Sequence, residues 1–133
     1  MICTSIKQSQ NLLKLRLSPD SADMEYCYID EFNSGLQVKG DINAEVDRRL
    51  DTMFGVTHIP AWSLSALLEV MPKECEPDIQ KSPISGVYFA HWFADGKPYI
   101  TDDHGNAVAA AYEMVCWMLE NNLIKKGGQD ERD

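Results

Sequence analysis

The sequence predicts a small α+β fold, in which an antiparallel hairpin over residues 86–101 is packed by helices near residues 5–17, 63–71 and 106–125. Apolar residues recur at every third or fourth position along the last two of these helical segments, which is typical of amphipathic helices. Between them lies a run rich in aromatic residues, followed by the Asp-Gly pair that is typical of a tight hairpin turn. This order of helix, hairpin and helix favours a mixed fold around one small sheet.

The N-terminal helix is expected to begin at Ser5, because Ser5 and Gln8 can form a capping box ahead of an apolar stripe. Ser18 then offers a second N-cap and Pro19 a first helical position, which predicts one tight helical turn. The aromatic and β-branched residues at 25–29 predict a short strand.

The next stretch is expected to contain a turn at residues 33–35, a small strand over residues 36–39 and a helix over residues 41–54. The turn is predicted because its residues are Asn, Ser and Gly, which favour turns. The helix is predicted because apolar residues follow Asp41, its expected N-cap, at spacings of four, four and three.

The helix over residues 63–71 has Ser63 as its natural N-cap, and Trp62 can pack on Leu67 as a hydrophobic staple. Pro72 ends this helix. Residues 73–83 are polar and contain two prolines, so we expect a surface loop there.

In the hairpin, a two-residue turn places Trp92 opposite Tyr99, and Phe93 opposite Pro98 on the other face. Proline cannot donate to a strand ladder, so Pro98 is expected on an edge strand or near the start of its strand. Both faces of the hairpin then carry apolar bulk, which predicts helices on both sides of the sheet.

The last helix is expected to start at the N-cap Asn106. Lys125 and Lys126 would complement its C-terminal dipole, and Gly127 would cap it in the left-handed conformation. We therefore expect one domain over residues 1–126 and a flexible acidic tail over residues 127–133.

The chain has 133 residues and a formal net charge of −9, which suits one acidic globular domain. This charge disfavours a nucleic-acid partner and suits a basic partner surface. The four cysteines form no C-x-x-C pair, and neither a signal peptide nor an apolar run of membrane-spanning length is evident. We expect reduced thiols, a cytoplasmic location and no membrane association.

The tightest cluster of chemical groups is Asp102, Asp103 and His104. It can be an acid/base or metal-binding turn, or a solvated turn whose acids complement the following helix, and capping explains every residue of it. His91 lies in the apolar strand, where a hydrogen-bonded histidine is simpler to explain than a ligand. The sequence therefore predicts no catalytic residues, no metal and no cofactor; the alternative is a small metal-dependent or acid/base hydrolase that uses these four residues.

Trp117 points away from the apolar stripe of the last helix, roughly opposite Val108. It can be buried elsewhere in the domain, or it can be exposed for association. On the second interpretation, Trp117, Trp92 and Tyr99 form a binding surface for another protein or for a second copy of the chain.

Three stretches carry a resemblance to other proteins: Ser18-Pro-Asp-Ser-Ala-Asp-Met24, Ile59-Pro-Ala-Trp-Ser-Leu-Ser-Ala-Leu-Leu-Glu-Val-Met-Pro72 and Ala110-Ala-Tyr-Glu-Met-Val-Cys-Trp-Met-Leu-Glu120. They resemble a large group of small uncharacterised proteins encoded by gut bacteria, often within prophages and other mobile elements. The layout from Ser63 onward is similar to small phage α-β-α sandwich domains. The resemblance implies a genomic setting and no catalytic residue set. We therefore expect a non-catalytic accessory protein of a phage or mobile element that binds an unknown protein or associates with itself, for example as a homodimer.

Overall fold

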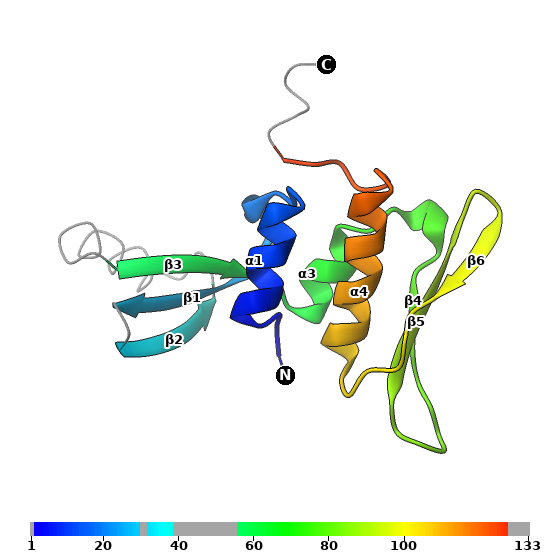
Figure 1. Cartoon of the computed structure of the whole chain (residues 1–133), viewed down its shortest axis with the longest axis horizontal. Helices are drawn as coiled ribbons and strands as arrows, with labels where there is room; N and C mark the ends of the chain where they lie inside the picture. The colour runs from blue at the N-terminus through cyan, green and yellow to red at the C-terminus, as the bar shows by residue number, and fades with distance from the viewer. Residues whose placement is uncertain (1, 30–31, 39–55, 128–133) are drawn as a thin grey trace.

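The computed structural model describes residues 2–29, 32–38 and 56–127 of the chain. Within these residues the chain forms three α-helices and two antiparallel sheets, which confirms the α+β fold class. In chain order the elements are α1 (Ile6–Lys14), η1 (Pro19–Ser21), β1 (Met24–Ile29), β2 (Phe32–Val38), β3 (Val56–Ala61), α3 (Leu64–Glu69), η2 (Lys73–Cys75), β4 (Asp78–Lys81), β5 (Tyr88–Ala94), β6 (Lys97–Ile100) and α4 (Ala107–Glu120). Figure 1 shows one sheet at each end of the molecule and the helices between the sheets. The predicted helix over residues 41–54 lies outside the described residues.

The first sheet has the strand order β2–β1–β3, and both neighbouring pairs are antiparallel. The predicted strand over residues 25–29 is confirmed as part of β1. The predicted turn at residues 33–35 is wrong, because these residues lie within β2, where Gly35 pairs with Cys27. Pairing with a neighbouring strand outweighs the turn preference of these residues. β3 is not predicted from the sequence, and it accommodates Pro60 because it is an edge strand of this sheet.

The second sheet has the strand order β4–β5–β6, and its hairpin has the predicted register. Trp92 lies opposite Tyr99, and Phe93 lies opposite Pro98 on the predicted edge strand. The two turn residues, 95–96, have φ values of 52° and 75°. Two successive left-handed residues form the type of turn that matches the twist of the flanking strands, which explains the preference for Asp-Gly.

β4 and η2 fall within residues 73–83, which the sequence predicts to be a loop, so that prediction is wrong for these elements. β4 pairs with β5 on one side only, and three of its four residues are exposed, with Ile79 half-buried. An edge strand with this little burial carries no apolar pattern that distinguishes it from a loop.

The helices α1 and α3 both begin where the sequence predicts. Ser5 and Gln8 form both hydrogen bonds of the capping box at α1. The Ser63 hydroxyl accepts a hydrogen bond from the Ala66 N–H at 3.2 Å and so caps α3. The Asp23 carboxylate in turn accepts hydrogen bonds from the Ser63 N–H and hydroxyl, so the residue just before β1 fixes the start of α3.

α4 begins at the predicted N-cap Asn106 but ends at Glu120, so the predicted end near residue 125 is wrong. Asn122 adopts a left-handed conformation with φ 59°, and the N–H groups of Asn122 and Leu123 bond back to carbonyls of the last helical turn. This arrangement is a Schellman motif, in which asparagine replaces the more common glycine.

Residues 123–127 return to the end of α1. Lys125 and Lys126 lie beyond α4, and Gly127 does not cap that helix. Instead, the Gly127 N–H donates to the Arg16 carbonyl at 2.7 Å. A Cβ atom on Gly127 would lie 3.0 Å from the Ser18 Cα, so the two segments are in close contact.

The buried core lies where α1, α3 and α4 meet. Trp62 is completely buried at the start of α3, and its indole N–H donates to the Ser21 hydroxyl at 2.9 Å. The other large, fully buried apolar side chains are Leu12, Leu67, Met114, Met118, Leu119 and Val115. None of the described helices is both long and apolar enough to cross a membrane.

Candidate functional site

The three aromatic residues predicted as a binding surface meet one another between α4 and the hairpin. Trp92 stacks on Tyr99 with 5.7 Å between ring centroids. The Trp117 ring centroid lies 4.4 Å from that of Tyr99 and 5.3 Å from that of Trp92. Trp92 is only 2% exposed, and the other two residues are half-buried. This aromatic cluster therefore joins α4 to the hairpin, which is the neighbour that Trp117 contacts.

Alternation along β5 gives the second sheet an inner and an outer face. Ala90, Trp92 and Ala94 are buried on the inner face, which α4 covers. The residues between them point to the opposite side, and the register adds residues from β4 and β6 to the same side. We call this side the outer face; it consists of Asp78, Gln80, Phe89, His91, Phe93, Pro98 and Ile100.

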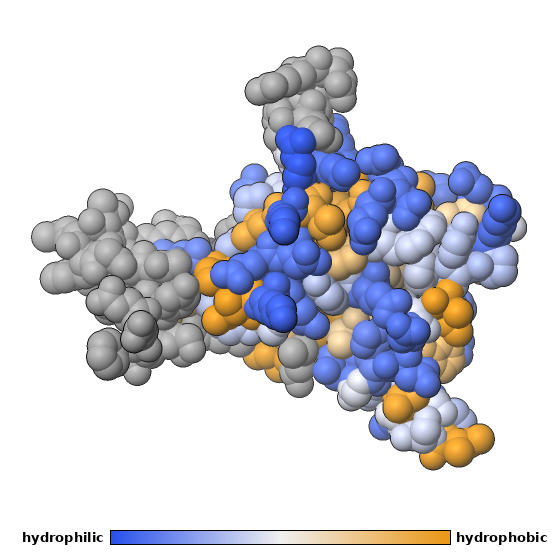
Figure 2. Space-filling model, viewed as in Figure 1, coloured by the Kyte–Doolittle hydropathy of each residue, from blue (hydrophilic) through white to orange (hydrophobic). Residues whose placement is uncertain are grey.

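Four of the seven outer-face residues are apolar, and some of them are well exposed. Phe93 is 42% exposed and Ile100 is 66% exposed, and Ile84 in the adjoining β4–β5 turn is 96% exposed. Figure 2 shows hydrophobic residues at the tip of this turn. The prediction of helices on both sides of the hairpin is wrong for the described residues, because α1 and α3 lie beyond α4 rather than over the outer face (Figure 1). Large exposed apolar side chains that lie together are typical of interaction surfaces.

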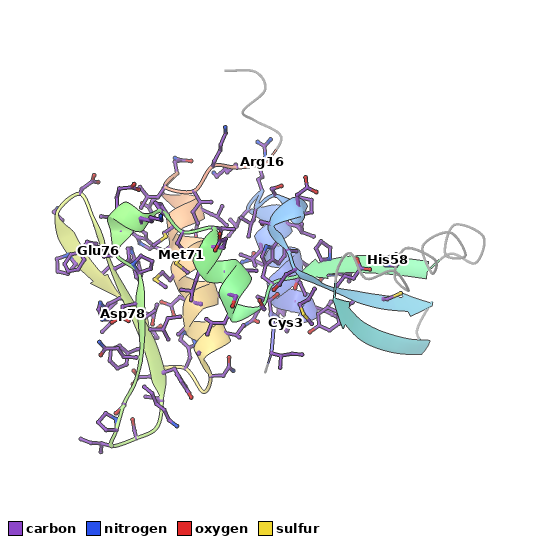
Figure 3. The ribbon with its side chains drawn as sticks, turned by 180° about the vertical axis from the view of Figure 1, so that it is seen from behind. Cys3, Arg16, His58, Met71, Glu76 and Asp78 are labelled. Atoms are coloured by element: carbon purple, nitrogen blue, oxygen red, sulfur yellow. The ribbon has the colours of Figure 1, made fainter. Side chains whose placement is uncertain are left out.

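A polar pair lies on the outer face, across the edge strand β4 and the central strand β5. The His91 Nε2 lies 3.1 Å from the Asp78 Oδ2, and the Gln80 amide donates to the same oxygen at 3.1 Å. About half of the Asp78 side-chain surface remains exposed, at 51%. Figure 3 shows Asp78 and Glu76 on this sheet's end of the molecule. The outer face therefore presents an exposed carboxylate on β4, beside the apolar side chains of β5 and β6.

The surroundings of the outer face are acidic. Lys81 and Lys97 lie on the inner side, since they pair with Tyr88 and Ala94, and the Lys81 ammonium lies 5.6 Å from the Tyr88 ring centroid. All acidic residues of the segment 73–105 are exposed, and they outnumber its three lysines two to one. These acidic residues are Glu74, Glu76, Asp78, Asp95, Asp102 and Asp103.

The structure does not bring together the four residues of the hydrolase alternative. His104 exchanges two backbone hydrogen bonds with Tyr88, which places His104 on the inner side, and its Nε2 lies 2.7 Å from the Glu113 Oε1 of α4. Glu113 also accepts from the Asp102 N–H at 3.3 Å, so this carboxylate holds the turn against the helix. His91 lies on the other face of the sheet. In residues 2–29, 32–38 and 56–127, no group of three or more histidine, cysteine and acidic side chains is arranged to hold a metal ion.

The four cysteines are free thiols. Burial raises the pKa of the Cys116 thiol to about 11, and burial also raises the pKa of Cys75. A thiol must ionise to act as a nucleophile, so neither of these cysteines is set up for catalysis at neutral pH.

Comparison of the chain with protein-family models, with curated proteins and with solved structures finds no match.

The outer-face residues themselves have a signal in the sequence, because the predicted register already places Phe93 opposite Pro98 on one side of the hairpin. The part of the prediction that is wrong is that a helix covers this side of the hairpin.

Proposed function

We propose that the chain is a non-catalytic binding protein, and that its outer face docks a basic partner protein that presents apolar side chains. The observation that best supports this proposal is the exposure of Phe93 and Ile100, at 42% and 66%, on a sheet face that no described helix covers. The resemblance to proteins of prophages and mobile elements adds a setting to the proposal, namely that of an accessory protein.

The apolar side chains provide the main driving force. Complete burial of a phenylalanine or isoleucine side chain contributes about 1.5–3 kcal/mol. Phe93 and Ile100 would each contribute part of this amount, because each is already partly covered. Phe89 and Pro98 extend the same face along the strands. A sheet face with four apolar residues suits a partner that buries a few apolar side chains against it.

The charges favour a basic partner over a second copy of the chain. The acidic group of the outer face is the Asp78 carboxylate beside His91, and the turns around the sheet are acidic. A lysine or arginine of the partner can pair with Asp78, and the net charge of −9 accelerates the encounter. Two copies would instead bring the same acidic surroundings together.

The proposal is tested with three labelled peptides of equal length: one of leucine and lysine, one of leucine and glutamate, and one of serine and lysine. Fluorescence anisotropy should show binding of the leucine–lysine peptide only, because the other two lack either the charge or the apolar anchors. Amide chemical-shift changes on binding should map to β4, β5 and β6. Binding of the serine–lysine peptide with equal affinity would contradict the proposal.

A matched pair of variants locates the surface. Ile100 and Ile2 are almost equally exposed, at 66% and 67%, but only Ile100 lies on the outer face. Ile100→Ser should weaken binding of the leucine–lysine peptide about fivefold or more, which corresponds to roughly 1 kcal/mol. Ile2→Ser should leave the affinity unchanged. Equal losses would show non-specific adhesion, and a dimer in sedimentation that Ile100→Ser dissociates would replace the basic partner with a second copy.

A further inference from the structure

α1 is the basic element of an acidic chain. The first 17 residues contain Lys7, Lys14 and Arg16 and no acidic residue, although the chain as a whole carries a net charge of −9. Within the part of the chain that the structure describes, neither Lys7 nor Lys14 forms an ion pair. Two ammonium groups on one helix are thus available to an external anion.

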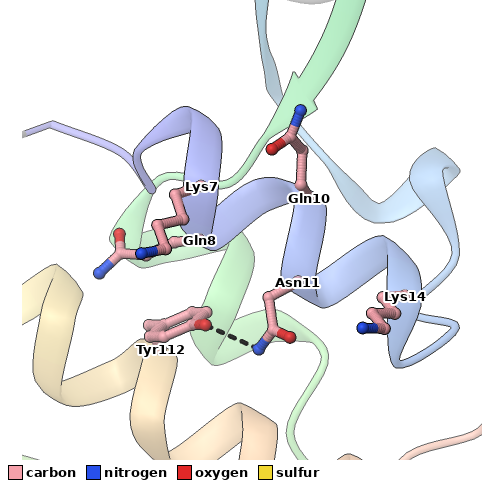
Figure 4. A pocket seen from close by; sticks show the side chains of 6 residues that line it. All are labelled: Lys7, Gln8, Gln10, Asn11, Lys14 and Tyr112. Atoms are coloured by element: carbon pink, nitrogen blue, oxygen red, sulfur yellow. Dashed lines mark hydrogen bonds between the residues drawn. The ribbon is translucent and has the colours of Figure 1, made fainter.

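These lysines border a groove between α1 and α4 with a volume of about 360 Å³. The groove is lined by Lys7, Gln8, Gln10, Asn11, Lys14 and Tyr112. Figure 4 shows Lys7 and Gln8 towards one end and Lys14 towards the other, with Asn11 between them and Tyr112 below Lys7 and Gln8. The volume lies in the range of small-molecule sites.

Helical spacing explains why the polar groups converge. Lys7, Asn11 and Lys14 are separated by four and three positions, which places them on one side of α1. The two lysines are about 10 Å apart along the helix axis, and their long flexible side chains can reach a group held between them. Asn11 at the middle of this row faces Tyr112 of α4.

The Tyr112 ring is fixed in place. The Asn11 side-chain amide donates to the Tyr112 hydroxyl at 2.8 Å and lies 3.7 Å from the Cys116 sulfur. Burial, followed by the neighbouring Cys116, raises the pKa of Tyr112, so the phenol stays neutral beside the lysines. A fixed neutral ring offers a face on which a flat ligand ring can stack.

We propose that this groove binds a small phosphate monoester with a flat ring. The phosphate group lies between the ammonium groups of Lys7 and Lys14, which donate charge-assisted hydrogen bonds to its oxygens. The ring of the ligand lies against Tyr112. The proposal is independent of the outer face, because the groove and the second sheet lie on different sides of α4 (Figure 1).

The test uses the full chain with phenyl phosphate, inorganic phosphate and phenol as probes, and reads amide chemical shifts during titration. Phenyl phosphate should bind with shifts at α1 and around Tyr112, inorganic phosphate about tenfold more weakly, and phenol not measurably. Equal affinities for phenyl phosphate and inorganic phosphate would overturn the assigned ligand class. Absence of phenyl phosphate binding at millimolar concentration would overturn the site.

Lysine variants separate a defined site from diffuse charge. Lys7→Gln and Lys14→Gln should each weaken phenyl phosphate binding about tenfold, and the double variant should abolish it. Lys97→Gln removes the same charge from the hairpin, which lies on the far side of α4 from α1, and should leave the affinity unchanged. All three lysines are exposed, so the folded state is retained. An equal loss in Lys97→Gln would show that only the overall charge matters.

Discussion

Replacement of Trp117 by alanine should lower the free energy of unfolding by about 2–4 kcal/mol, although Trp117 lies off the main apolar stripe of α4. The reason is that its ring joins α4 to the hairpin through Tyr99 and Trp92. The substitution removes the ring contributed by α4, so the stacked rings of Trp92 and Tyr99 lose their contact with the helix.

The magnitude follows from the geometry. Truncation of a large, buried aromatic side chain to alanine costs roughly 3–5 kcal/mol, and Trp117 is half-buried, so its loss falls towards the lower end. Its centroid distances of 4.4 Å and 5.3 Å are those of two favourable aromatic pairs. Each such pair adds about 0.5–1.5 kcal/mol beyond area burial. Trp117→Phe keeps one ring in place and should lose only about half as much as the alanine variant.

Urea denaturation measures the effect, because Trp62 and Trp92 remain as fluorescent probes. A double-mutant cycle with Tyr99→Ala should give a coupling energy of about 1 kcal/mol between the two rings. A Trp117→Ala protein that unfolds within about 0.5 kcal/mol of the original, with no coupling to Tyr99, would refute the reasoning. If that variant also changed from dimer to monomer in sedimentation, Trp117 would instead be an association residue.

Two further predictions concern a close contact and a buried thiol. Gly127→Ala should lower the melting temperature, because the added Cβ would lie 3.0 Å from the Ser18 Cα. Gly105→Ala should leave the melting temperature unchanged or raise it, because no atom lies within 4 Å of the added Cβ. Calorimetry compares the two variants, and equal shifts in melting temperature would contradict the contact between Gly127 and Ser18. The Cys116 pKa is raised by burial from 9.0 to about 11, so the unfolded chain releases this proton first and the stability that depends on it is lost as pH rises from about 9 to 11. In urea titrations at pH 8 and pH 10.5, Cys116→Ala should therefore show a smaller loss of stability with pH than the original chain; an identical loss would indicate that Cys116 ionises as easily when folded as when unfolded.

The features that the sequence predicts correctly are those that depend on a few neighbouring residues. The capping box of Ser5 with Gln8, the N-caps Ser63 and Asn106, and the Asp-Gly turn at residues 95–96 all lie where expected. The caps accept hydrogen bonds from free backbone N–H groups, and the turn residues adopt the backbone angles that the hairpin needs. Each of these features involves about four neighbouring residues, so no distant contact is needed.

Features that depend on distant partners are the ones that sequence reasoning misses. Residues 33–35 have turn chemistry but pair with β1, and the strand around Pro60 forms against the other side of β1. The candidate site follows the same rule. Alternation in the hairpin correctly separates Trp92 from Phe93, but whether a helix covers Phe93 depends on where α1 packs, and α1 is more than 70 residues earlier in the chain.

The contact between Gly127 and Arg16 affects when the protein can complete its fold during synthesis. α1 is synthesised more than 100 residues before its later partners, because Asn11 bonds to Tyr112 and Arg16 bonds to Gly127. Until those residues emerge, the inner side of α1 has no α4 to pack against, and a nascent chain would expose Leu12 of the core. Closure of so long a loop also slows folding. α1 therefore gains its contacts with Tyr112 and Gly127 only after α4 and the segment that follows it have been synthesised.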